Sequence, residues 1–182
     1  ATDGTNSSTV DVTVTSVDKT LPVITLAGSS AVTHEAKKTY SDDGASASDD
    51  RDGNVTSSIS VSGSVDINKI GSYPITFAVS DSAGNAASVV TRTVNVVDTT
   101  KPVITLTGNS EVTHEAATTY NDQGATASDT YDGVDLSVTS SGSVNVNSVG
   151  DYTITYAASD SAGNLATAVT RKVTVVDTTK PV

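Results

Sequence analysis

The chain repeats itself with a period of about 80 residues, and this self-similarity constrains its architecture more than any other feature. Pro22, Pro102 and Pro181 stand in the related contexts KTLPV, TTKPV and TTKPV. Between them, PVITLAGSSAVTHEAKKTYSDDG is answered by PVITLTGNSEVTHEAATTYNDQG, and GSYPITFAVSDSAGN is answered by GDYTITYAASDSAGN. About two positions in three are identical, so the same fold is expected twice.

The repeat predicts four segments along the chain. Residues 19–98 and 99–177 are two complete repeats, and residues 178–182 open a further one. Residues 1–18 are expected to be the tail of a preceding repeat, with its last strand at Val10–Val17. Because the chain also lacks an initiator methionine, we expect a slice of a longer array.

Apolar and polar residues alternate within each repeat, which is the period of a β-strand and not of a helix. Tyr73, Ile75, Phe77 and Val79 fall on one face of such a strand. Val and Thr together make up close to a third of the chain, as in all-β proteins. About seven short strands in each repeat predict a two-sheet sandwich. In the first repeat the predicted strands are Val23–Leu26, Ala31–Glu35, Tyr40–Ser48, Val55–Val61, Val65–Ile67, Tyr73–Val79 and Ala87–Val97.

One local motif favours a Greek-key sandwich in particular. In NKIGSY and NSVGDY a glycine precedes Tyr73 and Tyr152 by two residues. This spacing is similar to the tyrosine corner of Greek-key sandwiches, where the tyrosine hydroxyl bonds to upstream backbone. An ordinary core tyrosine is the alternative.

The segments VITLTGNSEVTHEAATTYNDQGATASDTYDG and VGDYTITYAASDSAGNLATAVTRKVTVVD resemble the bacterial immunoglobulin-like repeats of large surface proteins, a type also found in a pesticidal crystal toxin. The resemblance covers both repeats. Its motifs are weak singly and specific in this order and spacing. It implies tandem immunoglobulin-like Greek-key β-sandwiches on secreted or cell-surface bacterial proteins, usually without catalysis of their own.

The charge balance limits the partners. With 21 acidic and 10 basic side chains the net charge is -11, so nucleic acid and anionic membranes are disfavoured and cations are favoured. The chain has no cysteine for a disulfide or a thiolate nucleophile, and no apolar run long enough to insert into a membrane. No nucleophile elbow, Walker loop or dinucleotide loop is present. We therefore expect a monomeric chain that is not an enzyme.

Aspartates gather in the predicted turns and linkers. In a sandwich of this topology the linker and two of the loops meet at the end where the chain enters, so their carboxylates are expected to converge. Ca²⁺ accepts six to eight oxygen ligands in loose geometry, which flexible acidic loops supply. The layout is similar to that of cadherins. The predicted calcium ligands are Asp18, Asp49, Asp50, Asp52 and Asp81 at the first junction, and Asp98, Asp129, Asp132 and Asp160 at the second, with Glu35 contributed by the preceding repeat.

The alternative is that these aspartates form turns through bonds to their own backbone. Asp50 is replaced by Thr130 in the second repeat, so the two ligand sets differ in either case.

Two other motifs, for a zinc site and for a covalent crosslink, are incomplete. His34-Glu35 and His114-Glu115 begin the zinc motif HExxH, but the second histidine is missing and the segment is predicted to be a strand. An isopeptide crosslink from Lys37 or Lys38 is not repeated, because the second copy has alanine and threonine there.

The expected function is mechanical. The repeats would act as a non-catalytic extender of a bacterial adhesin, stiffened where calcium joins neighbouring repeats. Two alternatives stay open. The chain could be a binding module for a glycan or a cell-surface receptor, or an accessory part of a secreted hydrolase.

Overall fold

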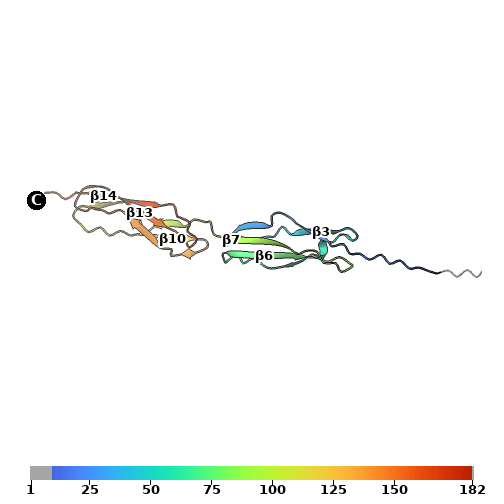
Figure 1. The fold of residues 1–182 in the computed structure, drawn as a ribbon. Helices are drawn as coiled ribbons and strands as arrows, with labels where there is room; N and C mark the ends of the chain where they lie inside the picture. Colours follow the sequence, from blue (N-terminus) through green and yellow to red (C-terminus); the bar gives the residue numbers. More distant parts are fainter. Residues whose placement is uncertain (1–9, 182) are drawn as a thin grey trace, which may run out of the picture. The chain divides into compact units, whose positions relative to one another are not determined.

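The computed structural model describes residues 10–181. Both repeats are built from β-strands and turns, and the described helical structure is the short 3₁₀ turn η1 (Thr56–Ser58). The predicted all-β class is therefore confirmed. Figure 1 shows the first repeat in blue to green and the second in yellow to red. Among residues 10–181, no helix has the length and hydropathy that crossing a bilayer requires.

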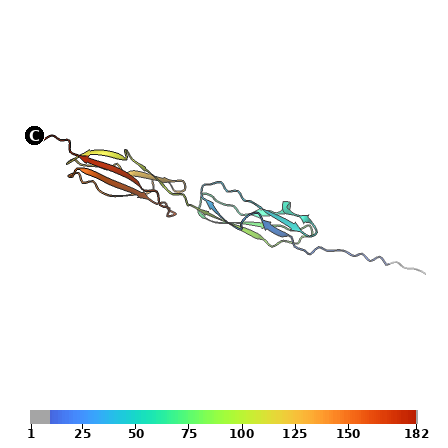
Figure 2. The same ribbon diagram turned by 90° about the horizontal axis from the view of Figure 1, so that it is seen from above.

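Each repeat has seven strands in two sheets. Figure 2 shows the same ribbon from above. In the first repeat the smaller sheet has the order β1-β3-β4, with β1 (Val23–Leu26), β3 (Ala45–Asp49) and β4 (Gly53–Asn54). Its larger sheet has the order β2-β7-β6-β5, with β2 (Ala31–Glu35), β7 (Val90–Val97), β6 (Gly71–Ala78) and β5 (Ser60–Ser62).

The second repeat follows the same plan. Its smaller sheet has the order β11-β10-β8, with β11 (Gly133–Val134), β10 (Ala125–Asp129) and β8 (Val103–Leu106). Its larger sheet has the order β12-β13-β14-β9, with β12 (Val138–Ser141), β13 (Gly150–Ala158), β14 (Val169–Val176) and β9 (Glu111–Glu115). The chain thus changes sheets between β8 and β9.

The pairing of β9 with β14 is parallel, so both strands end at the same edge of the sheet. Glu115 lies opposite Val176 in this register. In the first repeat, the backbone N–H of Ala36 donates to the carbonyl of Val97 at 2.7 Å, as the N–H of Ala116 does to that of Val176. The last residue of β2 or β9 is therefore placed beside the linker that follows β7 or β14.

The core lies between the two sheets of each repeat. In the first, Ile75, Phe77 and Val79 are buried, which confirms the predicted dry face. In the second, the packed cluster consists of Ile104, Ala127, Ile154, Tyr156 and Ala158. The tyrosine corners are also present, since the Tyr73 hydroxyl donates to the Lys69 carbonyl and the Tyr152 hydroxyl to the Ser148 carbonyl, both at 2.8 Å.

Side-chain bonding shortens two of the predicted strands. The segment Tyr40–Ser48 becomes strand only from Ala45, because the Asp42 carboxylate accepts the N–H of Gly44 at 2.7 Å and forms a turn. The segment Val55–Val61 is divided by η1. Here the Thr56 hydroxyl accepts the N–H of Ala47 and donates to its carbonyl, so a side chain bonds to β3 where a strand backbone was expected.

Two further segments differ from prediction. Residues Val65–Ile67 form no strand, and the last strand begins at Val90 and not at Ala87.

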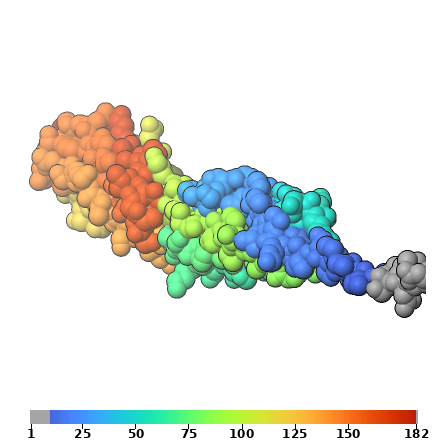
Figure 3. Space-filling model, turned by 45° about the vertical axis from the view of Figure 1, so that its right-hand side comes forward, coloured from blue at the N-terminus to red at the C-terminus, as the bar shows by residue number. Residues whose placement is uncertain are grey.

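The segment Val10–Val17 was predicted to be a strand and is not one. Val10, Val12 and Val14 are 77–85% exposed, and Figure 3 shows this part of the chain in dark blue. A strand is stable only beside other strands. Residues 10–181 offer this segment none, so its alternating pattern stays extended.

Candidate metal centres

The chain divides into two compact units, and each contains one group of clustered carboxylates. The first unit comprises residues 10–32 with Ser41–Ser64 and Pro74–Val94. The second comprises Thr33–Tyr40, Val65–Tyr73 and residues 95–181. The division passes through the first repeat, so the segment boundaries at 19–98 and 99–177 stay a prediction.

The second unit holds Asp98, Asp129 and Asp132, here named the second acidic group. One carboxylate oxygen of each lies within 4.8 Å of the others. Asp98 follows β7 in the linker, Asp129 ends β10, and Asp132 lies in the turn before β11. Asp98 and Asp129 are only 6% and 8% exposed. A linker and a loop that are distant in sequence therefore bring three negative charges together.

In this group, one oxygen of each buried carboxylate is bonded and the other is not. Asp98 Oδ1 accepts the N–H of Thr100 at 3.1 Å, and Asp129 Oδ1 accepts the N–H of Tyr131 at 2.7 Å. Asp98 Oδ2 and Asp129 Oδ2 are buried without a hydrogen-bond partner. Burial raises the pKa of Asp98, and the nearby charges of Asp129, Asp160 and Glu35 raise it further, against a lowering by the Thr100 N–H. This arrangement costs free energy unless a cation meets the free oxygens.

The first unit contains the corresponding first acidic group of Asp18, Asp49 and Asp50. Asp18 Oδ1 accepts the N–H of Thr20 at 3.0 Å, and Asp49 Oδ1 accepts the N–H of Arg51 at 2.9 Å. The Oδ2 atoms of Asp18 and Asp49 are buried without a partner, as in the second group. Here Asp50 supplies the third carboxylate, which Asp132 supplies in the second group.

Asp81 and Asp160 were predicted to join these groups, and the structure does not bring them in. Asp160 accepts the N–H of Asn164 at 2.7 Å and its side-chain amide at 2.8 Å. That amide also donates to the backbone carbonyl of Asp98 at 3.1 Å, and the Asn85 amide donates to that of Asp18 at 3.2 Å. The two aspartates therefore hold the asparagines that fix the linker.

These contacts leave Asp160 ionised at ordinary pH. Burial raises its pKa, but the hydrogen bonds from Asn164 and from the backbone outweigh burial and lower it. The same balance, with Asn85 as the donor, lowers the pKa of Asp81.

Asp52 was also predicted as a ligand, and it lies outside the first acidic group. It accepts the N–H of Ser82 at 2.6 Å and its hydroxyl at 2.9 Å. Asp132 makes the same two contacts with Ser161, at 3.1 and 2.6 Å, and still belongs to the second group. These bonds tie the two loops of each repeat to each other.

Glu35 was predicted to contribute a ligand to the second site, and it lies outside the second acidic group. Its two oxygens accept hydrogen bonds from the backbone and hydroxyl groups of Thr99 and Thr100. Glu35 thus binds the linker that carries Asp98.

A sequence model of the family described as "Bacterial surface protein, Ig-like domain" matches residues 24–96 and 104–175. The chain belongs to this family. Each match covers one Ig-like repeat, in agreement with the two sandwiches. No curated protein shows significant similarity to the chain.

Three solved structures align with the Ig-like repeats over part of their length. A lipoprotein of Bacteroides thetaiotaomicron is 29% identical, with 44% of this chain and 40% of that chain covered and a TM-score of 0.38. Two structures come from ZmpB of Clostridium perfringens. One, with CBM51-2 in complex with GlcNAc and INT domains, is 24% identical over 48% of this chain and 20% of that chain, with a TM-score of 0.36. The other, the M60 catalytic domain with CBM51-1 and CBM51-2, is 13% identical over 88% of this chain and 31% of that chain, with a TM-score of 0.47.

This chain therefore spans less than half the length of each of these structures. All three TM-scores lie below 0.5, so the family rests on the sequence match.

Both histidines of the Ig-like repeats have local partners. A ring nitrogen of His34 lies 2.9 Å from the Lys38 carbonyl, and that of His114 lies 3.1 Å from the Thr118 carbonyl. The His114 ring also packs edge-on against Tyr120. Their place at the end of β2 and β9 is explained by these contacts.

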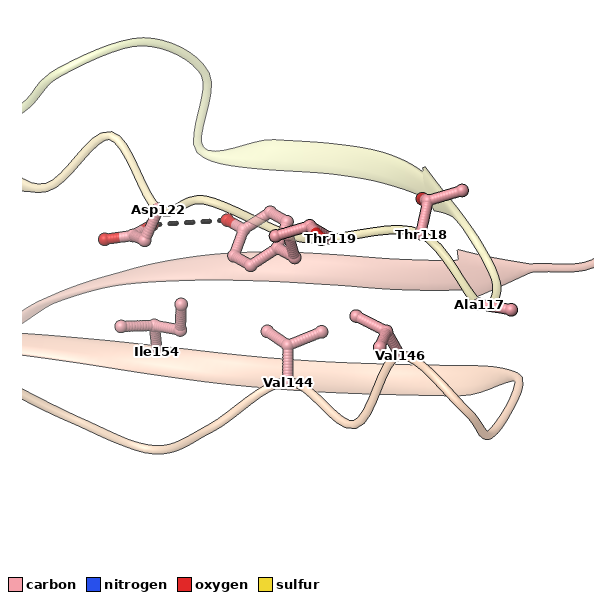
Figure 4. Close-up of a pocket in the computed structure, with 8 residues that line it drawn as sticks. Ala117, Thr118, Thr119, Asp122, Val144, Val146 and Ile154 are labelled. Atoms are coloured by element: carbon pink, nitrogen blue, oxygen red, sulfur yellow. Dashed lines mark hydrogen bonds between the residues drawn. The ribbon is translucent and has the colours of Figure 1, made fainter.

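The second Ig-like repeat has an open cavity of about 470 Å³, shown in Figure 4. Val144, Val146 and Ile154 line one side, opposite the segment that carries Thr118 and Asp122. Asp122 is the carboxylate of this lining, and it accepts hydrogen bonds from Tyr120, Tyr156 and Arg171. The cavity therefore has an apolar side, and the Asp122 carboxylate on its other side is already paired with Arg171.

Three kinds of residue that hold the linker or the core were missed from the sequence. These are the linker threonines, the asparagines of the SDSAGN turns, and two arginines of the last strands. The sequence contained a clue to the threonines and asparagines, because the segments DTT, after the last strand, and SDSAGN recur unchanged in both repeats. Identical polar letters in turns that otherwise vary indicate side chains with fixed partners.

Proposed function

We propose that this chain is a non-catalytic extender of a bacterial surface or secreted adhesin, in which each acidic group binds Ca²⁺ and restricts the linker. One observation carries the proposal. Asp98 Oδ2 and Asp129 Oδ2 are buried without a hydrogen-bond partner, and the two carboxylates belong to the same group. A buried group left unpaired costs about 1–3 kcal/mol, and more when it is charged. A shared cation would compensate both.

The donor set favours calcium among the common cations. All three ligand atoms of each group are carboxylate oxygens. Zinc prefers nitrogen and sulfur ligands, and magnesium demands a strict octahedron. Ca²⁺ tolerates the irregular geometry of a linker and a turn, and water would complete its shell.

The mechanical role follows from where the ligands come from. Asp98 lies in the linker, whereas Asp129 ends β10 and Asp132 lies in the turn after it, both in the following repeat. An ion bound to all three would fix the linker to that repeat. The family description supports a surface location. The pairing of Asp122 with Arg171 supports a structural role for the carboxylate in the cavity.

Calorimetric titration of metal-stripped protein with Ca²⁺ tests the proposal. We expect two ions per chain and a higher melting temperature, since a ligand at 100 times its Kd stabilises by about 2.7 kcal/mol. Asp98→Asn and Asp129→Asn should each abolish one of the two binding events. Asp151→Asn is the matched control, because Asp151 is an exposed carboxylate paired with Lys172 outside either group. An absence of heat, with a melting temperature indifferent to millimolar calcium, would contradict the proposal.

A further inference from the structure

The linker is held by a carboxylate that belongs to neither acidic group. Glu35 Oε1 accepts the Thr99 N–H at 3.0 Å, the Thr100 N–H at 3.2 Å and the Thr100 hydroxyl at 2.7 Å. Glu35 Oε2 accepts the Thr99 hydroxyl at 2.6 Å. Glu35 with Thr99 and Thr100 is named the Glu35 clasp. Because four donors occupy its two oxygens, this carboxylate is committed to the linker.

These bonds keep Glu35 ionised. Burial raises its pKa, but the hydrogen bonds from Thr99 and Thr100 outweigh burial and lower the pKa to about 2. The clasp is therefore charged and charge-assisted, which makes its hydrogen bonds stronger than neutral ones.

The same clasp occurs a second time, away from any acidic group. Glu115 accepts the N–H and hydroxyl of Thr178, at 2.9 and 2.8 Å, and the hydroxyl of Thr179 at 3.1 Å. Asp177 precedes these threonines as Asp98 precedes Thr99, but in the described chain it belongs to no carboxylate group. The Glu115 clasp thus has the same donors as the Glu35 clasp, the two threonines that follow the last strand of the repeat.

The Glu35 clasp is connected directly to a proposed cation ligand. The N–H of Thr100 lies between two acceptors, Glu35 Oε1 at 3.2 Å and Asp98 Oδ1 at 3.1 Å. This shared donor orients the Asp98 carboxylate so that Oδ2 is the atom left free. On the other side, Asn164 holds the Asp98 carbonyl.

In the linker before the first repeat, the equivalent threonine has a different partner. There the hydroxyl of Thr20 donates to Asp50 Oδ2 at 3.3 Å, a carboxylate of the first acidic group. The equivalent hydroxyl of Thr100 donates to Glu35. The two threonine hydroxyls therefore have different acceptors, since the position equivalent to Asp50 is Thr130 in the second repeat.

We propose that Glu35 is a positioning residue for the divalent cation site of Asp98, Asp129 and Asp132, and that its clasp orders the linker before the cation binds. This inference rests on the proposed function. Glu35 was predicted to be a ligand, and here it instead orients the ligand Asp98 through the shared Thr100 N–H. Groups that orient ligands in this way typically change metal affinity by about tenfold or more when they are removed.

Terbium luminescence can report on this site in the whole chain. Tb³⁺ accepts the same oxygen ligands as Ca²⁺, and a nearby tyrosine sensitises its emission. Tyr131 lies between Asp129 and Asp132 and donates its N–H to Asp129, whereas the corresponding residue of the first group is Arg51. Titration excited through tyrosine, followed by competition with Ca²⁺, therefore follows the second group.

Three variants separate positioning from charge. Glu35→Gln should weaken binding at the second group about tenfold. Glu115→Gln removes the same charge from the equivalent clasp and should leave this affinity unchanged. The double variant Thr99→Val/Thr100→Val keeps the Glu35 charge and removes two of its donors, so it should also weaken binding. Equal affinities of wild type, Glu35→Gln and Glu115→Gln would overturn the inference, as would a loss in Glu35→Gln with none in the double variant.

Amide hydrogen exchange in chelator supplies a readout that does not depend on the ion. The N–H groups of Thr99 and Thr100 should be protected in the metal-free wild type and lose protection in Glu35→Gln. Free exchange of both in the wild type would show that the clasp does not precede the cation. If the wild type binds neither Tb³⁺ nor Ca²⁺, the proposed function fails. In that case the exchange experiment still decides whether the clasp exists.

Discussion

At the scale of single residues, each sandwich depends on an arginine that occupies a dry face. Arg171 is 1% exposed, yet it lies in β14 in line with Val173 and Val175. Its guanidinium donates to the Asp122 carboxylate and to the backbone carbonyls of Thr107, Asn109 and Gly124, among other acceptors. A planar group with five donors is satisfied only by such a ring of acceptors. Arg92 makes the equivalent contacts in the first repeat.

The neighbouring residues Arg171 and Lys172 offer a matched test of this interpretation. Arg171→Met should lower the free energy of unfolding by about 3 kcal/mol, because it leaves Asp122 and several carbonyls without their donor. Lys172→Met removes a pair whose side chains are 50% and 57% exposed and should cost less than about 1 kcal/mol. Urea unfolding followed by circular dichroism measures both. Similar losses in the two variants would contradict the assigned role of Arg171.

At the scale of elements, the chain turns after β12 against the backbone of β13. Gly142 has a φ of +96°, and a Cβ placed there would lie 2.2 Å from the Thr153 carbonyl oxygen. Gly63 meets the Pro74 carbonyl oxygen at the same distance in the first repeat. Both repeats thus require glycine at this turn for steric reasons as well as for backbone conformation.

Gly163 shares the backbone conformation of Gly142 but not its steric restriction. Its φ is +90°, but a Cβ there meets no atom within 4 Å. Gly163→Ala should therefore cost only the backbone strain of about 1–2 kcal/mol. Gly142→Ala adds a clash with backbone that cannot move alone, so it should cost at least about 3 kcal/mol. The melting temperatures of the two variants give the comparison, and equal shifts would mean that the close approach to β13 is unimportant.

At the scale of the whole molecule, the net charge of -11 favours cations over anions as partners. The second acidic group places three carboxylates where the linker meets the following repeat. Under the proposed function, repulsion between these carboxylates would separate the linker from the loop when no cation is bound, and a bound cation would draw them together. The Glu35 clasp acts on the other side of the same linker.

Small-angle scattering of the whole chain should detect this change. We expect a larger maximum dimension and a narrower spread of conformations in calcium than in chelator. The variant Asp98→Asn/Asp129→Asn should give the same profile in calcium and in chelator. The same maximum dimension for the wild type in calcium and in chelator would contradict the stiffening role, even if calorimetry detects binding.

The sequence alone determined the repeat, the β-strands and the gathering of acidic turns. These features depend on local patterns, namely a period of two in strands such as β6 and turn residues between them. The tyrosine corners at Tyr73 and Tyr152 were predictable for the same reason, because donor and acceptor lie four residues apart. The convergence of Asp98 with Asp129 followed from the topology of a sandwich.

Only the tertiary structure decided which partner each polar group takes. Asp129 leaves an oxygen free, whereas Asp160, an equally plausible ligand in sequence, is occupied by Asn164. Glu35 proved to bind threonines, and Arg171 proved to lie in the core beside valines. Hydrogen bonds select among many chemically similar groups by distances of a few tenths of an ångström, and residues 30 to 70 positions apart acquire such distances only after the sheets have packed.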